Sequence, residues 1–249
     1  MTARAEVLGC AIGRLDMEAT VREVERVIAS RRFTQHVSIN TAKLVTLRGD
    51  PELRAIVEGC GLISADGAGI VWASRLLRDP LPERVAGIDL MHRLLARAEE
   101  KGYGVYFLGA RPEVLALALE RIRERHPRLI VAGARDGYFE ESESAGVAAA
   151  IRATGADIVF VAMSSPRKEY FLGTHGERLG APFVMGVGGS IDVVAGVTRR
   201  APVAWQRLGL EWLYRLLQEP RRLFRRYAVT NARFALMLGR ALFSFGGRP

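Results

Sequence analysis

The sequence has little cysteine and no long apolar run. Its two cysteines, Cys10 and Cys60, match neither a CxxC redox pair nor a zinc-binding motif. Arg233 and Arg240 interrupt the longest apolar candidate, residues 227–245, and the first residues lack the apolar segment of a signal peptide. We therefore predict no transmembrane helix, and two reduced thiols in or near the core of a cytoplasmic protein.

Motifs of several common enzyme classes are also absent. The sequence contains no DxD, which is the metal-binding motif of many nucleotide-sugar transferases, and its four histidines form no HExxH pair. It contains no P-loop and no GxSxG nucleophile motif. We therefore predict a site without a metal or other cofactor, in which arginines, a lysine and helix N-termini neutralise an anionic ligand.

The net charge of +9 lies entirely in one part of the chain. Residues 199–249 contain eleven arginines and two acidic residues, Glu211 and Glu219, whereas residues 1–198 contain 25 basic and 25 acidic residues. Such asymmetry is typical of a segment that meets an anionic surface, either a membrane or a nucleic acid.

Short apolar runs that end in Gly, Asp, Asn or Ser alternate with helical patterns through the first 198 residues. This alternation predicts an α/β fold, with a Rossmann-like, mostly parallel sheet and helices on both faces. Residues 1–199 would form this domain, and residues 200–249 a helical, basic C-terminal appendage. The predicted strands are 36–40, 61–67, 104–110, 128–133, 157–162 and 182–189, and the predicted helices between them include 16–31, 87–101, 112–125 and 142–153.

The appendage is expected to end in a long amphipathic helix, residues 220–245. At about 100° per residue, one face collects Phe224, Tyr227, Phe234, Leu238, Leu242 and Phe245, and the other Arg222, Arg226, Arg233 and Arg240. Such a helix is typical of a membrane interface, although its apolar face could also pack on the protein's own core. We take an anionic membrane, and no nucleic acid, as its partner, and expect the tail to stay mobile until it meets lipid.

Asp66 directly follows a predicted strand and precedes Gly67 and Gly69. Ligands of parallel sheets bind beyond the carboxyl ends of the strands, where a carboxylate can act as a general base. The same aspartate could instead cap a helix in a tight turn. The local pattern leaves both interpretations open.

Other polar residues and glycines follow the remaining strands. An arginine ahead of a helix start can bind phosphate, and glycines at strand ends let helix N–H groups approach a diphosphate. Each also has a structural interpretation, as a solvated arginine, a capped turn or an ordinary helix start. The candidates are Ser38, Asn40, Thr41, Arg84, Gly109, Lys168, Glu169, Gly188 and Gly189.

Taken together and in order, these motifs resemble the WecG/TagA/CpsF family of bacterial glycosyltransferases. Each match alone is short, but the ordered set covers most of the chain. The matching segments are Asn40-Thr41, Ala65-Asp66-Gly67, Arg84 with Gly87 and Asp89, Phe107-Leu108-Gly109, Pro166 with Glu169, residues 186–192, Ala195-Gly196, Arg200-Ala201-Pro202, residues 211–216, and Glu219-Pro220 with Arg222.

The resemblance implies an inverting, metal-independent transfer from a UDP-sugar, often UDP-N-acetylmannosamine, to a polyprenyl-diphosphate-linked sugar in cell-surface polysaccharide, teichoic acid or exopolysaccharide synthesis. It implies Asp66 as the general base, and Ser38, Asn40 and Arg84 in the pocket. It also implies an enzyme peripheral to the inner face of the cytoplasmic membrane, with appendage arginines near the diphosphate, here Arg215, Arg221 or Arg225.

One position departs from the family pattern. Lys168 stands where the family often has Gln, so the donor sugar stays open between a hexose and an N-acetylhexosamine. Two other function classes also stay open: an NAD(P) oxidoreductase, although no GxGxxG is present, and a non-enzymatic module that binds anionic surfaces. The sequence does not decide whether the chain forms a homo-oligomer.

Overall fold

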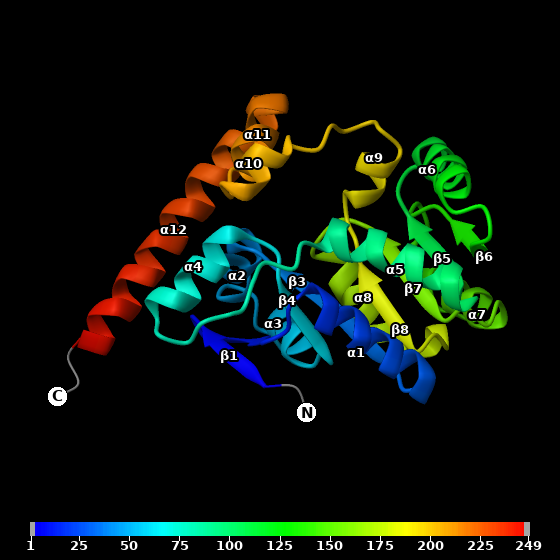
Figure 1. The fold of residues 1–249 in the computed structure, drawn as a ribbon, viewed down its shortest axis with the longest axis horizontal. Coiled ribbons are helices and arrows are strands. Elements are labelled where there is room, and N and C mark those ends of the chain that lie inside the picture. The colour runs from blue at the N-terminus through cyan, green and yellow to red at the C-terminus, as the bar shows by residue number, and fades with distance from the viewer. Residues whose placement is uncertain (1–2, 247–249) are drawn as a thin grey trace.

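A computed structural model describes residues 3–246, without the side chains at positions 207, 222, 226 and 244–246. Six strands form one parallel sheet in the order β4-β3-β8-β7-β5-β6, and β1 and β2 form a separate antiparallel hairpin (Figure 1). The strands are β1 Arg4–Val7, β2 Cys10–Gly13, β3 Thr34–Ile39, β4 Leu62–Ala65, β5 Gly104–Gly109, β6 Ile130–Arg135, β7 Ile158–Ala162 and β8 Phe183–Gly186.

Helices connect the strands and cover the sheet. Two of them are short 3-10 turns, η1 Glu141–Glu143 and η2 Glu177–Leu179. The α-helices of the described part are α1 Met17–Ser30, α2 Thr41–Leu47, α3 Pro51–Glu58, α4 Ala68–Leu76, α5 Gly87–Lys101, α6 Pro112–Arg125, α7 Ser144–Ala153, α8 Arg167–His175, α9 Ser190–Val194, α10 Val203–Arg207, α11 Glu211–Gln218 and α12 Pro220–Gly246.

Strand β5 illustrates why both faces of the sheet are covered. Side chains alternate along a strand, and in β5 both sets are apolar and buried. Val105 and Phe107 pack in a cluster with residues of α1, α5 and α6, whereas Tyr106 and Leu108 pack in another with residues of α7 and α8. The expected parallel α/β sheet with helices on both faces is therefore confirmed.

A third apolar cluster fills the end of the molecule that carries β3 and β4. The β1–β2 hairpin, α2, α3 and α4 contribute to it, and Cys10 and Cys60 are both buried there. Burial raises the pKa of the Cys10 thiol to about 11 and that of Cys60 to about 12. The prediction of core thiols is confirmed.

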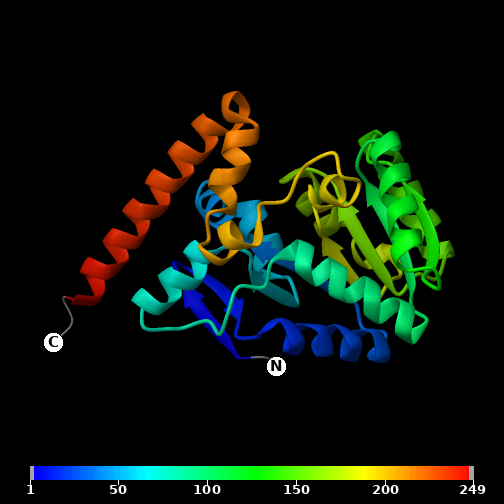
Figure 2. The same cartoon turned by 45° about the horizontal axis from the view of Figure 1, so that its top comes forward.

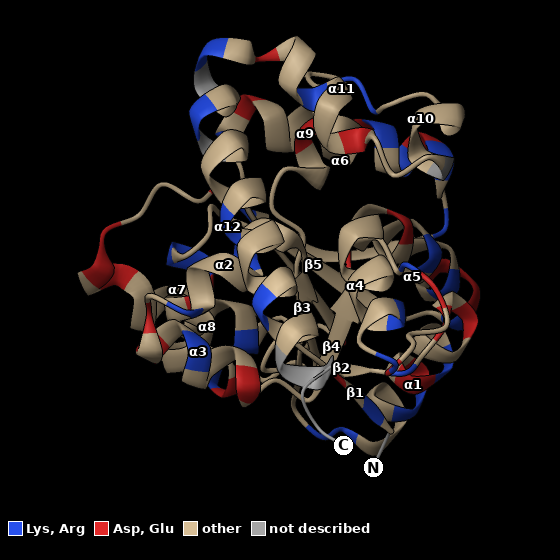
Figure 3. Ribbon diagram, turned by 90° about the vertical axis from the view of Figure 1, so that its left-hand side faces the viewer, with Lys and Arg blue, Asp and Glu red and all other residues tan. Residues whose placement is uncertain are grey.

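Helix α12 completes this third cluster. It runs along α2 (Figures 2 and 3). Its residues Phe234, Met237 and Leu238 pack onto the cluster. The structure therefore differs from the expected mobile tail, because part of the apolar face that could meet lipid is already packed on the protein and partly buried. Phe224 still lies 65% exposed. The side chains of Arg222, Arg226 and Phe245 lie outside the described residues.

Two parts of the fold depart from the expected element list. The N-terminal hairpin was not predicted, because its strands have four residues each and Leu8 takes a left-handed conformation in the turn. The segment after residue 40, for which no helix bounds were predicted, forms two helices, α2 and α3, since Asp50 caps a new helix that begins at Pro51. Among residues 3–246, no helix has the length and apolar character needed to cross a bilayer.

Candidate active site

The carboxyl ends of β3 and β4 lie side by side and form the centre of the site. Ser38 and Ser64 are register partners on these strands, and the Asp66 N–H extends the ladder by donating to the Ile39 carbonyl at 2.8 Å. Asp66 and Asn40 therefore leave the sheet at the same edge, where ligands of parallel sheets bind.

Gly87, the first residue of α5, separates Ser38 from Asp66. A Cβ atom built on Gly87 would lie 3.2 Å from the Ser38 Oγ and 3.7 Å from the Asp66 Oδ2. The Gly87 N–H donates a hydrogen bond to the Asp66 carboxylate. The absence of a side chain at residue 87 thus lets the start of α5 approach both polar groups, and its helix dipole favours negative charge at Asp66.

Burial nevertheless dominates the protonation of Asp66. It raises the pKa of the carboxyl group from 3.8 to about 7, with a further increase from Glu211. The Arg84 guanidinium, the Gly87 hydrogen bond and Lys43 act in the opposite direction and lower that pKa. A carboxylate with a pKa near neutrality can accept a proton from an attacking hydroxyl group and release it again, which is what a general base requires.

An ion-pair network joins four segments beside Asp66. Arg84 pairs with Glu211 at the start of α11, and its Nη2 lies 4.0 Å from the Asp89 Oδ2 in the first turn of α5. Arg200 binds both Asp89 oxygens, at 2.6 and 2.7 Å, and its Nε lies 3.7 Å from the Glu211 Oε1. The sequence predicted a site role for Arg84, but it gave no role to Glu211 or Arg200, although both fall in segments that carry the family resemblance.

Asn40 and Thr41 occupy the start of α2. The Asn40 side chain accepts from the Lys43 N–H at 2.9 Å and caps the helix. A Cβ on Gly69 would lie 2.9 Å from the Thr41 Cγ2, so the first turn of α2 contacts the first turn of α4. The glycines after β4 therefore allow close packing of two helix starts next to Asp66.

The turn after β8 receives an arginine from the appendage. Gly188 has a φ of +49°, and a Cβ on Gly189 would lie 3.1 Å from an Nη atom of Arg215 on α11. This glycine turn and Arg215 are thus brought together, as expected for a site that binds a diphosphate. Arg221 and Arg225 are exposed on the first two turns of α12.

A model of the glycosyl transferase WecG/TagA/CpsF family matches residues 5–246. The match covers the sheet, the residues around Asp66 and the appendage up to the end of α12. The chain belongs to the WecG/TagA/CpsF family of glycosyltransferases. Family membership decides between the function classes that the sequence left open, in favour of a transferase over an oxidoreductase or a binding module.

Lys168 and Glu169 lie buried beneath the site of this WecG/TagA/CpsF glycosyltransferase. One Glu169 oxygen accepts from the Lys168 Nζ at 2.6 Å and from the Lys43 Nζ at 2.7 Å, while the other Glu169 oxygen has no hydrogen-bond partner. Burial and the neighbouring Lys43 lower the pKa of Lys168 to about 8. Burial alone would raise the pKa of Glu169, but the two ammonium groups outweigh it and lower that pKa.

Gly109 lies farther along the same edge of the transferase, at the end of β5. Its φ is +118°, and a Cβ would lie 2.5 Å from the Ala162 carbonyl carbon, so the position requires glycine. An open cavity of about 480 Å³ lies beyond the neighbouring strand end, and its lining includes Tyr138, Phe139 and Arg167.

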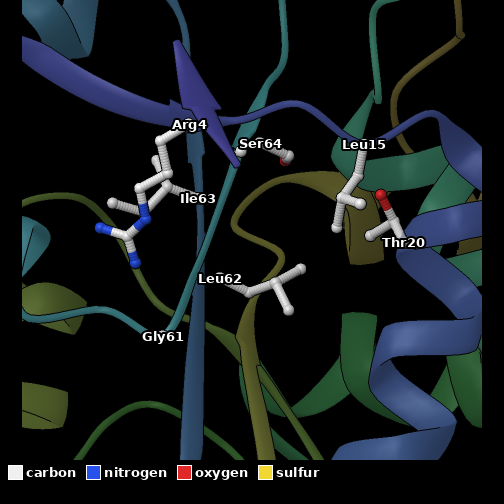
Figure 4. Close-up of a pocket in the computed structure, with 8 residues that line it drawn as sticks. Arg4, Leu15, Thr20, Gly61, Leu62, Ile63 and Ser64 are labelled. Atoms are coloured by element: carbon white, nitrogen blue, oxygen red, sulfur yellow. The ribbon is translucent and has the colours of Figure 1, made fainter. Parts of the chain in front are cut away.

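A second, much smaller cavity lies between β4 and the N-terminal hairpin (Figure 4). At about 10 Å³ it has room for about one water molecule, so it is too small for a sugar nucleotide. His36 and Ser64 share a hydrogen bond of 2.9 Å behind it, and burial lowers the pKa of His36 to about 3. We assign this region of the WecG/TagA/CpsF protein to the core.

The residues near Asp66 are suited to binding anions through cations. Arg84, Arg200 and Arg215 all reach this edge of the sheet, where a diphosphate could accept hydrogen bonds from guanidinium groups in place of a metal. Within residues 3–246, no group of three His, Cys, Asp or Glu side chains is arranged to hold a metal ion. The metal-free site remains a prediction.

Proposed function

We propose that this glycosyltransferase transfers a hexose or N-acetylhexosamine, with N-acetylmannosamine as one candidate, from a UDP-sugar to a polyprenyl-diphosphate-linked sugar. The transfer inverts the anomeric carbon and requires no metal ion. It serves the synthesis of a cell-surface polysaccharide, a teichoic acid or an exopolysaccharide. The catalytic part comprises residues 1–199, and residues 200–249 associate with the inner face of the cytoplasmic membrane.

The position and protonation of Asp66 carry this proposal. The carboxylate stands at the carboxyl edge of the sheet, beside Ser38, Gly87 and Arg84, and its pKa is raised to about 7. It is therefore largely ionised slightly above neutral pH and still basic enough to take a proton as the reaction proceeds. Ser38 has an unpartnered Oγ next to it, which is available to a substrate hydroxyl group.

The reaction is a single displacement. The acceptor hydroxyl oxygen bonds to the anomeric carbon of the donor while the bond from that carbon to the diphosphate oxygen of UDP breaks. The hydroxyl proton passes to Asp66, and UDP leaves with the electron pair. Because the acceptor attacks opposite the leaving group, the anomeric configuration is inverted.

Cations near the glycine turn after β8 would stabilise the leaving UDP. Arg215 already lies against Gly189, and Arg84 and Arg200 lie in the network beside Asp66. Fixed positive groups of this kind act where negative charge develops in the transition state. Arg221 and Arg225 are exposed and can approach the diphosphate of a lipid-linked acceptor at the membrane surface.

Lys168 bears on the choice of donor sugar. Two lysines and one glutamate form a buried cluster with a net positive charge, and Glu169 keeps a free acceptor oxygen. A cation in place of the family's common amide changes the charge beneath the pocket. We expect Lys168→Gln to change the preference among donor sugars more than it changes the affinity for UDP.

Association with the membrane is supported by the outer surface of α12. Residues 220–246 contain no acidic residue (Figure 3). Val229, Leu236 and Phe243 on this helix are exposed at seven-residue spacing. Arg225 and Arg233 are exposed on the same helix. An apolar stripe with arginines matches the chemistry of an anionic lipid surface.

The decisive experiment measures UDP release from a panel of UDP-sugars with a polyprenyl-diphosphate-linked sugar as acceptor. We expect acceptor-dependent turnover with one donor, lost in Asp66→Ala and Asp66→Asn. Asp136→Asn is a matched control, because Asp136 follows β6 at the same edge and its side chain accepts from the Tyr138 N–H, which Asn can also do. Turnover that persists in both Asp66 variants would contradict the role of the base, and the absence of any UDP binding would contradict the donor.

A further inference from the structure

Glu211 is the one acidic residue of α11, and its carboxylate reaches across to the sheet. It pairs with Arg84 through one oxygen, and its other oxygen lies 3.7 Å from the Arg200 Nε. The side chain is only 29% exposed. Two guanidinium groups from separate loops therefore converge on one carboxylate of the appendage.

The same two arginines have a second anchor in the first turn of α5. Asp89 binds Arg200 through both oxygens and lies 4.0 Å from Arg84. Glu211 and Asp89 thus both hold the arginines, one from the appendage and the other from the helix whose N-terminus contacts Asp66. This arrangement fixes the positions of two guanidinium groups at the ends of side chains that are otherwise long and flexible.

The surroundings of Asp66 depend on this balance of charge. Arg84 faces it from the segment after β4, Lys43 from α2, Arg200 from the segment after α9, and Glu211 from α11. Loss of Glu211 would remove a negative charge near Asp66 and leave Arg84 without its closest anion. Both changes favour the ionised form of Asp66.

We propose that Glu211 is a positioning residue of the transfer reaction, which holds Arg84 and Arg200 beside Asp66 and so makes the docked appendage part of the active site. The inference rests on the proposed role of Asp66. It goes beyond that role, because an acidic residue of the appendage, and not only its arginines, is assigned a function.

A purely structural salt bridge and a positioning residue predict different results. If Glu211 only attached α11 to the sheet, its removal would lower stability and would shift the pKa of Asp66 through the lost charge, but kcat/KM of the folded protein would not change. If it positions the arginines, Glu211→Gln lowers both the pKa of Asp66 and kcat/KM, because Arg84 and Arg200 lose the carboxylate that holds them. Arg84→Gln should raise that pKa, since a positive charge is lost.

The test begins with the carboxyl NMR titration of full-length protein labelled with ¹³C at aspartate, with Asp66→Asn used to identify the signal. We expect the Asp66 midpoint to move to lower pH in Glu211→Gln and to stay in place in Glu113→Gln. Glu113 is a matched control, since it lies in the first turn of α6, 3.5 Å from Arg111, and is exposed. An unchanged Asp66 midpoint in folded Glu211→Gln would overturn the proposal.

The second measurement is the pH profile of kcat/KM for UDP release. We expect Glu211→Gln to lose about 10- to 100-fold in kcat/KM, as for a misplaced catalytic contact, and its acidic limb to move to lower pH. Glu211→Asp keeps the charge and should recover part of the loss. Equal kcat/KM in wild type and Glu211→Gln would also overturn the proposal. If the wild type released no UDP with any donor, the proposed reaction would fail, while the titration would still show whether Glu211 sets the charge around Asp66.

Discussion

Arg84 forms an ion pair with Glu211, which follows it in the chain by 127 residues. One partner precedes α5 at the edge of the sheet, and the other begins α11 in the appendage. The arginine that the sequence predicts to bind substrate is therefore held by an anion in this structure. A diphosphate that binds Arg84 must share this guanidinium with Glu211 or displace it.

Replacement of Asp66 should stabilise the protein while it abolishes turnover. The folded-state pKa of about 7 exceeds the ordinary value of 3.8, so the folded protein binds the proton more tightly and loses stability as pH rises between these values. A shift of this size corresponds to about 4 kcal/mol, and we expect about half of it because the side chain is only partly buried. In urea denaturation at pH 8, the free energy of unfolding of Asp66→Asn should exceed that of wild type by about 2 kcal/mol. At pH 4 the two proteins should have almost the same free energy of unfolding. A constant difference at both pH values would contradict the shifted pKa.

Gly109→Ala should be far more destabilising than an ordinary glycine substitution. The new Cβ would meet the Ala162 backbone at 2.5 Å, and a φ of +118° is unfavourable for alanine. We expect a loss of about 3 kcal/mol or more in the free energy of unfolding. Gly102→Ala is the control, since it has a φ of +72° and no atom within 4 Å, and should cost about 1–2 kcal/mol. If thermal or urea unfolding gave similar losses of stability for the two variants, the close approach of β5 and β7 would not be what requires glycine at residue 109.

The two members of the buried pair at positions 168 and 169 should respond differently to neutralisation. Glu169→Gln leaves Lys43 and Lys168 buried without an anion, which we expect to cost about 3–5 kcal/mol. Lys168→Gln leaves the Lys43–Glu169 pair intact and should cost about 1 kcal/mol or less. Urea unfolding at pH 7 measures both. A larger loss of stability in Lys168→Gln than in Glu169→Gln would mean that Lys168, and not Glu169, holds this cluster together.

Charge reversal on the outer face of α12 should weaken binding to lipid. Arg225→Glu combined with Arg233→Glu removes two exposed arginines, each worth about 1 kcal/mol at an anionic surface. We expect the full-length double variant to pellet less than wild type with vesicles that contain anionic phospholipid, and wild type not to pellet with neutral vesicles. Arg123→Glu with Arg125→Glu on α6 is the control, with the same change of charge at exposed positions at the far end of the molecule. Equal pelleting of the two double variants would assign the contact to another surface.

The sequence predicted the sheet well because its strands are short, apolar on both faces and ended by polar residues or glycine. Helix α5 spans residues 87–101, as its periodicity predicts, and Asp66 and Asn40 lie at neighbouring strand ends. What local patterns could not supply are contacts between distant segments. The pairing of Arg84 with Glu211 and the packing of Phe234 on the third cluster depend on how the appendage folds back, and local sequence spacing does not encode that.

The packing of α12 on α2 also bears on the order in which the protein can be completed during synthesis. Helix α2 leaves the ribosome long before α12, so the surface that Phe234 and Leu238 later cover stays open while the sheet strands are made. During that interval the nascent chain exposes an apolar patch next to the candidate site. A ribosome-bound intermediate of this protein should therefore bind chaperones until α12 emerges.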